Sequence, residues 1–156
     1  MRIGIIVHSK TGRTLALAQL IEKRLKKLNH GVSLHHLTID PDIEAPNKPF
    51  RIVNRPDIAP YDLLLVGGPV WAFSASPVIL SYLKSLGDLK GKKVIPFATM
   101  GFPCACLGGT RALGQMGKAA AANGATTLPG AVVPTMLRDH ERLKQEAADK
   151  IAEVVG

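Results

Sequence analysis

Cysteine, aromatic residues and acidic side chains are all scarce in this chain. Its 156 residues include 2 cysteines and 4% aromatic residues, and 12 Asp and Glu stand against 20 Lys and Arg. Two cysteines are too few for a disulfide framework, and 46% hydrophobic residues are enough for a core at this length. We therefore expect a single domain over residues 1–156 that needs neither disulfides nor a structural metal.

Long hydrophobic runs without interruption are absent as well. Stretches 63–83, 94–110 and 119–137 carry no charge, but glycine and proline cut each of them. That pattern is typical of buried strands joined by tight turns rather than of membrane spans. Because no basic and then apolar leader precedes the first strand, and cysteine is rare, we expect a cytoplasmic protein.

The net charge of +8 would suit an anionic partner. The few aromatic residues are not interleaved with the basic ones, however, which disfavours nucleic acid as that partner. Part of the positive charge has a structural explanation, because Lys23, Arg24, Lys26 and Lys27 fall at the end of an expected helix and complement its dipole.

Short apolar runs alternate with segments of helical periodicity along the chain. The runs predict strands at 3–7, 32–37, 63–66, 93–98 and 127–132, and the periodic segments predict helices at 12–28, 77–86, 110–123 and 139–155. Residues 38–60 are rich in proline, and we expect an irregular connection there. The alternation predicts a three-layer α/β fold, in which helices cover both faces of a parallel sheet.

In such sheets, ligands bind beyond the carboxyl ends of the strands. The first loop at this edge runs directly into a helix, and its residues are Ser9, Lys10, Thr11, Gly12, Arg13 and Thr14. Three hydroxyls, two cations and free backbone N–H groups at a helix start predict a phosphate cradle. The loop is neither a Walker loop nor a Gly-x-Gly-x-x-Gly fingerprint. A hydroxyl cap followed by an ordinary turn is the alternative interpretation.

The pattern Ser-x-Thr-Gly-x-Thr after a first strand resembles the FMN phosphate loop of flavodoxins. Residues 61–71 and 90–101 are similar to the second and third flavin loops of that family, and the three motifs occur in order within residues 1–124. The resemblance implies a flavodoxin-like fold with five strands in the order 2-1-3-4-5 and one non-covalently bound FMN. The fifth strand is too short for a long insertion, so the chain resembles the short-chain form.

Carried over by residue, the resemblance implies that the loop 9–14 holds the FMN phosphate. The flavin ring would lie between two further loops, whose residues are Pro69, Val70, Trp71, Ala72 and Phe73 on one side and Thr99, Met100, Gly101 and Phe102 on the other. Trp71, Phe73 and Phe102 could stack on a planar ring. Alternatively, Trp71 and Phe73 pack the top of the sheet.

The chain departs from the acidic composition of electron-transfer flavodoxins. Neither ring loop contains Asp or Glu, and Lys10, Arg13 and Arg111 lie on or beside the cofactor loops. A cation near the ring would stabilise the anionic reduced flavin by about 1 kcal/mol and raise its potential. Two functions therefore remain open. One is a carrier of electrons between redox partners, including an acidic partner protein. The other is an FMN-dependent two-electron reductase of quinones or other small acceptors.

Three further motifs predict no site. Cys104 and Cys106 lack the Cys-x-x-Cys spacing of redox pairs, and we interpret them as small residues at a helix start. His35 and His36 point to opposite faces of a strand, which disfavours a metal site. Cys106 and Arg111 are one residue too close together for the loop of a low-molecular-weight tyrosine phosphatase. A receiver domain would need acidic residues that the first and third loops lack.

Overall fold

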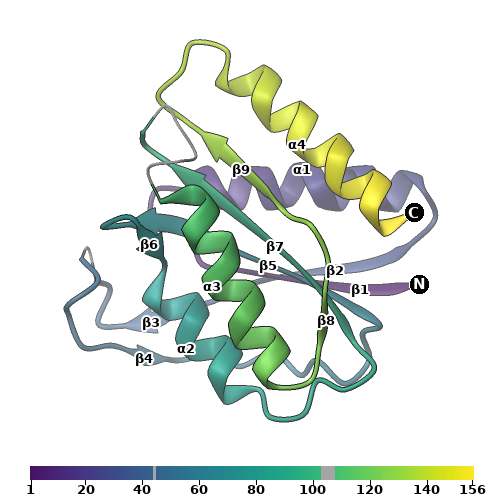
Figure 1. Cartoon of the computed structure of the whole chain (residues 1–156), viewed down its shortest axis with the longest axis horizontal. Coiled ribbons are helices and arrows are strands. Elements are labelled where there is room, and N and C mark those ends of the chain that lie inside the picture. The colour runs from purple at the N-terminus through teal and green to yellow at the C-terminus, as the bar shows by residue number, and fades with distance from the viewer. Residues whose placement is uncertain (44, 103–107) are drawn as a thin grey trace.

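A mainly parallel sheet forms the centre of the protein (Figure 1). The computed structural model describes residues 1–43, 45–102 and 108–156. Its strands follow the order β2-β1-β5-β7-β8, and β9 continues the edge by pairing with β7. These strands are β1 (Arg2–Val7), β2 (Gly31–His36), β5 (Leu63–Trp71), β7 (Lys93–Met100), β8 (Thr126–Thr127) and β9 (Ala131–Pro134).

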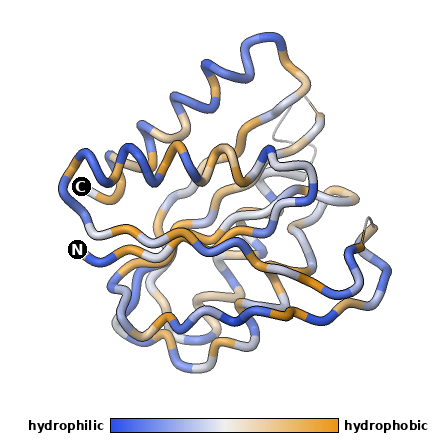
Figure 2. Tube along the Cα trace, turned by 180° about the vertical axis from the view of Figure 1, so that it is seen from behind, coloured by the Kyte–Doolittle hydropathy of each residue, from blue (hydrophilic) through white to orange (hydrophobic). Residues whose placement is uncertain are grey.

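Helices cover both faces of the sheet, as the sequence predicts. On one face, α1 (Arg13–Lys27) packs against α4 (His140–Val155), and on the other α2 (Pro77–Ser85) packs against α3 (Gly109–Ala122). The central strands are largely coloured as hydrophobic in Figure 2, whereas the outer helices alternate between hydrophobic and hydrophilic colour. Alternate residues of one strand serve the two cores: Ile6 packs in the α2–α3 core, whereas Ile5 and Val7 pack in the α1–α4 core. Burial on both faces explains why the strands lack polar alternation.

The predicted three-layer α/β fold and the order 2-1-3-4-5 are confirmed, with the fifth strand divided into β8 and β9. Pro96 in β7 explains the division. Leu128 N–H donates to Val94 O, so residue 96, two positions further along β7, faces the same edge, where a proline has no N–H to donate. Gly130 lies so close to the Pro96 carbonyl that a Cβ would be 1.7 Å from its oxygen.

Two expectations about the connections are wrong in detail. The loop expected to begin at Gly67 is strand as far as Trp71, and β6 (Ser74–Ala75) then pairs with it antiparallel, so the sheet is not purely parallel. Gly67 permits this continuation because the Phe97 ring occupies the space of a Cβ, at 2.1 Å. Within residues 38–60, β3 (Ile39–Asp40) and β4 (Arg51–Ile52) form a small antiparallel pair. Among the described residues, no helix is long and apolar enough to cross a membrane.

Candidate functional site

The carboxyl ends of three neighbouring strands bring the predicted loops together. Val7 of β1 pairs with Gly67 of β5, and Pro69 of β5 pairs with Thr99 of β7. The segment after β1, the turn after β5 and the segment after β7 therefore meet at one edge of the sheet. Crevices at such an edge are where doubly wound α/β sheets bind their ligands.

The segment after β1 forms a tight cradle at the start of α1. Ser9 Oγ accepts hydrogen bonds from the N–H groups of Gly12, at 3.1 Å, and Leu15, at 3.2 Å. Gly12 adopts a φ of 89°, which favours glycine, and a Cβ there would meet nothing within 4 Å. The Ser9 hydroxyl thus caps α1, and the loop still forms an exposed cradle, so the two interpretations of this motif are compatible. The loop is open on its outer side, and the helix dipole favours an anion there.

Two buried threonines beneath the cradle suit a phosphate oxygen. Thr14 and Thr99 are 2% and 5% exposed, and their Oγ1 atoms are 2.7 Å apart. One hydroxyl donates to the other, so one O–H still needs an acceptor, and among the described residues neither hydroxyl has another partner. An acceptor-rich group bound in the cradle could take this hydrogen. The residues present thus fit a phosphate.

The two cations of the cradle have different partners. Lys10 Nζ lies 2.5 Å from Asp42 Oδ2. Arg13 Nη1 donates to Thr135 Oγ1 at 3.2 Å, and the Thr135 hydroxyl donates to the Met100 carbonyl at 3.0 Å. Arg13 therefore connects the cradle to the ends of β7 and β9, while Asp42 partly neutralises Lys10. The positive field expected from Lys10 is weaker for this reason.

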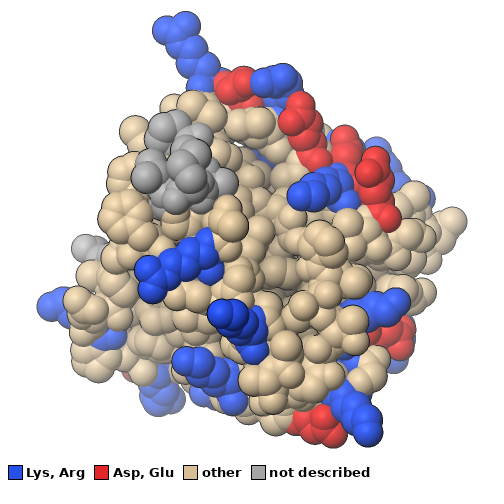
Figure 3. All heavy atoms as spheres, viewed as in Figure 1, with Lys and Arg blue, Asp and Glu red and all other residues tan. Residues whose placement is uncertain are grey.

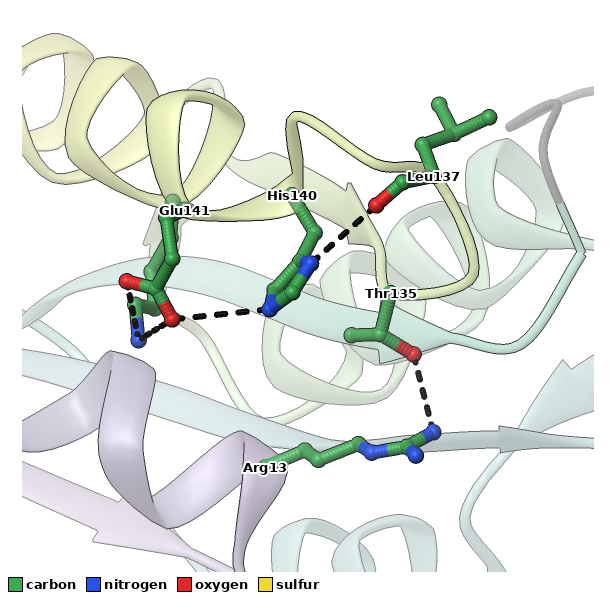
Figure 4. A network of polar contacts seen from close by, with 6 residues as sticks. Arg13, Thr135, Leu137, His140 and Glu141 are labelled. Atoms are coloured by element: carbon green, nitrogen blue, oxygen red, sulfur yellow. Dashed lines mark hydrogen bonds and ion pairs between the residues drawn. The ribbon is translucent and has the colours of Figure 1, made fainter.

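A cavity of about 340 Å³ adjoins the cradle on the side of α4. Its walls combine cradle residues such as Gly12 and Arg13 with the first turn of α4. There, Glu141 contacts both His140 Nε2, at 3.5 Å, and Lys144 Nζ, at 3.0 Å, and Figure 4 shows Arg13 and Glu141 reaching in from opposite sides. Since α1 and α4 both begin here, the helix dipoles add to the preference for an anion.

The turn between β5 and β6 presents two aromatic residues beside the cradle. Trp71 pairs with Ser74, and the two residues between them, Ala72 and Phe73, have φ values of 51° and 63°. Left-handed conformation at both central positions matches a type I′ hairpin turn, which normally uses Asn and Gly. Strain of this kind clusters at functional sites.

The two ring loops meet through their aromatic residues. The rings of Phe73 and Phe102 stack with centroids 5.4 Å apart and an interplanar angle of 14°. Both side chains are nearly half exposed, at 49% and 48%. Gly108, just before α3, supports the turn from behind, because a Cβ there would lie 2.6 Å from the Phe73 Cα. The alternative in which Phe73 packs the top of the sheet does not account for this exposure.

His8 lies buried behind Trp71. Its ring meets the indole edge-on, at 5.3 Å and 87°, and its Nδ1 lies 2.7 Å from Ser76 Oγ. Burial lowers the pKa of His8 to about 4, assisted by the nearby charges of His36 and Lys10 and opposed by that of Asp42. His8 is therefore neutral at pH 7, and it fixes Trp71 without adding charge to the site.

The predicted site residues fall into two groups. Those of the cradle and the aromatic turn, with Gly101 and Phe102, lie at the expected edge. The predicted loop residues that belong to strands are Pro69, Val70, Trp71, Thr99 and Met100. Met100 is 3% exposed, and its sulfur would lie 2.9 Å from a Cβ on Gly109, so it is a core residue. Cys104 and Cys106 lie outside the described residues.

Four residues that shape the site were not among those predicted from the sequence: His8, Asp42, Ser76 and Thr135. Ser76 had a recognisable signal, because it precedes Pro77 and caps α2 through the Val78 N–H. Asp42 and Thr135 had none, since each reaches the cradle from a distant segment of the chain.

Comparisons with known proteins agree with this geometry. The model of a protein family described as flavodoxin matches residues 42–133, more than half of the chain. The chain belongs to the flavodoxin family, and membership implies flavin binding, generally of FMN. No curated protein matches the chain.

Several solved structures share the fold. A flavoprotein from Bacteroides uniformis is 21% identical, with a TM-score of 0.69 over 93% of this chain and 96% of that chain. Oxidised flavodoxin 2 from Bacillus cereus is 20% identical, with a TM-score of 0.66 over 98% and 99%. Two-electron reduced flavodoxin from Megasphaera elsdenii is 24% identical, with a TM-score of 0.61 over 94% and 98%.

Proposed function

We propose that this protein binds one FMN and carries electrons between redox partners. The observation that carries the proposal is the meeting of an open anion cradle with the two aromatic ring loops at the ends of β1, β5 and β7. FMN combines a phosphate with a planar ring, so it needs both kinds of surface at one place. When bound, it would supply reversible uptake of one or two electrons.

In this proposal, the chain's own residues divide the work of binding. The N–H groups of the loop 9–14, apart from that of Gly12, which donates to Ser9 Oγ, hold the phosphate together with the Thr14 and Thr99 hydroxyls. Trp71, Phe73 and Phe102 bind the ring, and His8 keeps the indole of Trp71 in place. Phe73 and Phe102 leave part of their surface to solvent, which gives a partner access to the ring edge.

A two-electron reductase of quinones or other small acceptors is the second candidate. It is favoured by the ring loops, which contain no carboxylate, and by the exposed Arg111 in the first turn of α3. A positive surrounding stabilises an anionic reduced ring and so brings the two one-electron potentials together. The neutralisation of Lys10 by Asp42 weakens this effect and favours the carrier.

Stepwise anaerobic reduction of the FMN-loaded protein distinguishes the two functions. A carrier takes up its electrons in two separate one-electron steps, and it shows slow turnover of NAD(P)H with quinones. A reductase takes up both electrons in one step, and it oxidises NAD(P)H rapidly when a quinone is present. A protein that fails to bind FMN at all would refute both functions.

A further inference from the structure

The two helical layers of the protein differ in how their charged side chains are paired. On the α1–α4 layer, basic side chains pair with acidic ones, as in Arg24 with Asp149 at 2.9 Å and Lys144 with Glu141 at 3.0 Å. Helices α2 and α3 contain no Asp or Glu at all. Figure 3 shows the result: blue and red side chains mix over α4, whereas only blue ones stand over α2 and α3.

Four cations on or beside this second layer have no acidic partner among the described residues. They are Arg55, Lys84, Arg111 and Lys118, and all four side chains are exposed. Arg55 donates instead to Ser85 Oγ at 2.6 Å, which holds its guanidinium at the end of α2. Simple solubility does not require such segregation, because the other layer meets that need with mixed charge.

A groove with an apolar floor runs between these cations. Leu80 of α2 and Ala119 and Ala122 of α3 line a hollow of about 440 Å³ whose edges carry Lys84 and Lys118. The Asn123 side chain donates to the Leu83 carbonyl at 2.7 Å and fixes the two helices together at this end. We call this hollow the α2–α3 groove.

A second hollow widens the surface on the other side of α2. It has a volume of about 550 Å³, and Phe50 and Pro77 contribute its apolar walls. Leu80 and Lys84 line both hollows, so the two lie next to each other on either side of these α2 residues. An apolar strip bordered by cations on both helices is complementary to an amphipathic helix with acidic flanks.

We infer that the α2–α3 groove is a docking site for a partner protein that presents an acidic amphipathic helix. The apolar floor favours a protein over a nucleic acid. Among the described residues, Phe50 alone brings an aromatic ring to either hollow, and four separated cations do not form a track for a phosphate backbone. A second copy of this chain would bring like charges together, which disfavours self-association here.

The position of the groove also suits electron transfer, a point that rests on the proposed function. Helix α3 begins beside the ring loops, where Gly108 packs against Phe73, and Arg111 stands in its first turn. The groove lies along the C-terminal half of α3, and a partner helix that continues from it to the first turn of α3 would reach the exposed edge of Phe73 and Phe102. The basic side chains of this surface would attract the acidic partner toward this edge.

The test uses the whole protein and a fluorescent 18-residue helical peptide of leucine and glutamate, measured by anisotropy at 0.15 M salt. We expect binding that weakens on the order of tenfold in the double variant Lys84→Glu, Lys118→Glu. Leu80→Ser should weaken it several-fold at unchanged charge. The matched control, Lys23→Glu with Lys27→Glu on α1, changes the net charge equally and should alter binding less than twofold.

Three results would overturn the inference: no binding of the peptide, an equal loss in the α1 control, or tighter binding of a 12-nucleotide oligo-dT that depends on the same two lysines. Amide chemical shifts should change over α2 and α3 and not over α1. Because the assay contains no flavin, its outcome is separate from FMN binding, so failure of the proposed function would leave the result unaffected.

Discussion

Phe73 and Phe102 approach from different loops and stack on each other, with ring centroids 5.4 Å apart. Phe73 lies in a turn whose left-handed backbone its own residue type disfavours. Phe102 lies two residues beyond the end of β7. Two parallel aromatic rings, each about half exposed, stand where the two ring loops meet, and their exposed surfaces are available to a planar ligand there.

Removal of one of these rings should weaken FMN binding without unfolding the protein. We expect Phe102→Ala to raise the Kd for FMN about tenfold, since stacking on an aromatic ring contributes roughly 1–3 kcal/mol. The free energy of unfolding should fall by less than about 1.5 kcal/mol because the side chain is exposed. Absorbance titration and urea denaturation measure the two effects. Leu28→Ala, at the far end of α1, should change neither Kd nor stability appreciably.

The cradle should recognise the phosphate and not the ring. Thr14→Val removes a hydroxyl that the phosphate would use, so FMN affinity should fall on the order of tenfold while the affinity for riboflavin stays the same. Stability should drop by about 1 kcal/mol through loss of the bond to Thr99. Equal losses for FMN and riboflavin, measured by the same titration, would exclude Thr14 from the phosphate site.

Two glycines in the region of α3 should respond to alanine substitution in opposite ways. Gly108→Ala forces a Cβ against the Phe73 backbone at a φ of 115°, and we expect a loss of roughly 2–3 kcal/mol in stability together with weaker FMN binding. Gly114→Ala places its Cβ in open space inside the helix and should stabilise the protein by up to about 1 kcal/mol. Thermal unfolding compares them, and a neutral Gly108→Ala would show that the turn does not depend on this contact.

His8 should make stability depend on pH. Its pKa is about 4 in the folded chain and 6.5 in the unfolded one, so the unfolded state binds its proton first as pH falls. The stabilising contribution is complete above pH 6.5 and is lost between about 6.5 and 4, a change of about 3 kcal/mol. Urea denaturation of wild type and His8→Gln from pH 8 to 4 should show this slope in the wild type and lose it in the variant. Parallel curves would contradict a neutral buried His8.

Local patterns in the sequence were sufficient for the central strands and the four helices, because each central strand is a short apolar run and each helix has an amphipathic period. The two-residue strands β3, β4 and β6 had no such signal. The ends of β5 and β7 were not predictable in this way. Gly67 and Gly68 usually signal a turn, yet here the Phe97 ring fills the space beside Gly67 and the strand continues. The division of the fifth strand depends on Pro96, which lies in a different strand.

The site divides in the same way: residues that form a local motif were predictable, and residues that arrive from distant segments were not. Ser9, Gly12 and Thr14 lie in one contiguous motif, so the cradle was visible in the sequence. Asp42 and Thr135 act on Lys10 and Arg13 from segments far along the chain, and only the folded structure brings them there. Of the three cations expected near these loops, Lys10 is consequently the one whose charge was overestimated from the sequence.

Trp71 allows the central claim, that FMN binds between the ring loops, to be tested directly. It is the only tryptophan of the chain and stands at the end of β5. Titration of the flavin-free protein with FMN should quench its fluorescence to a plateau at one equivalent, and riboflavin should do so more weakly. If the fluorescence and the FMN absorbance both remained unchanged up to a large excess of FMN, the account of this site would be wrong.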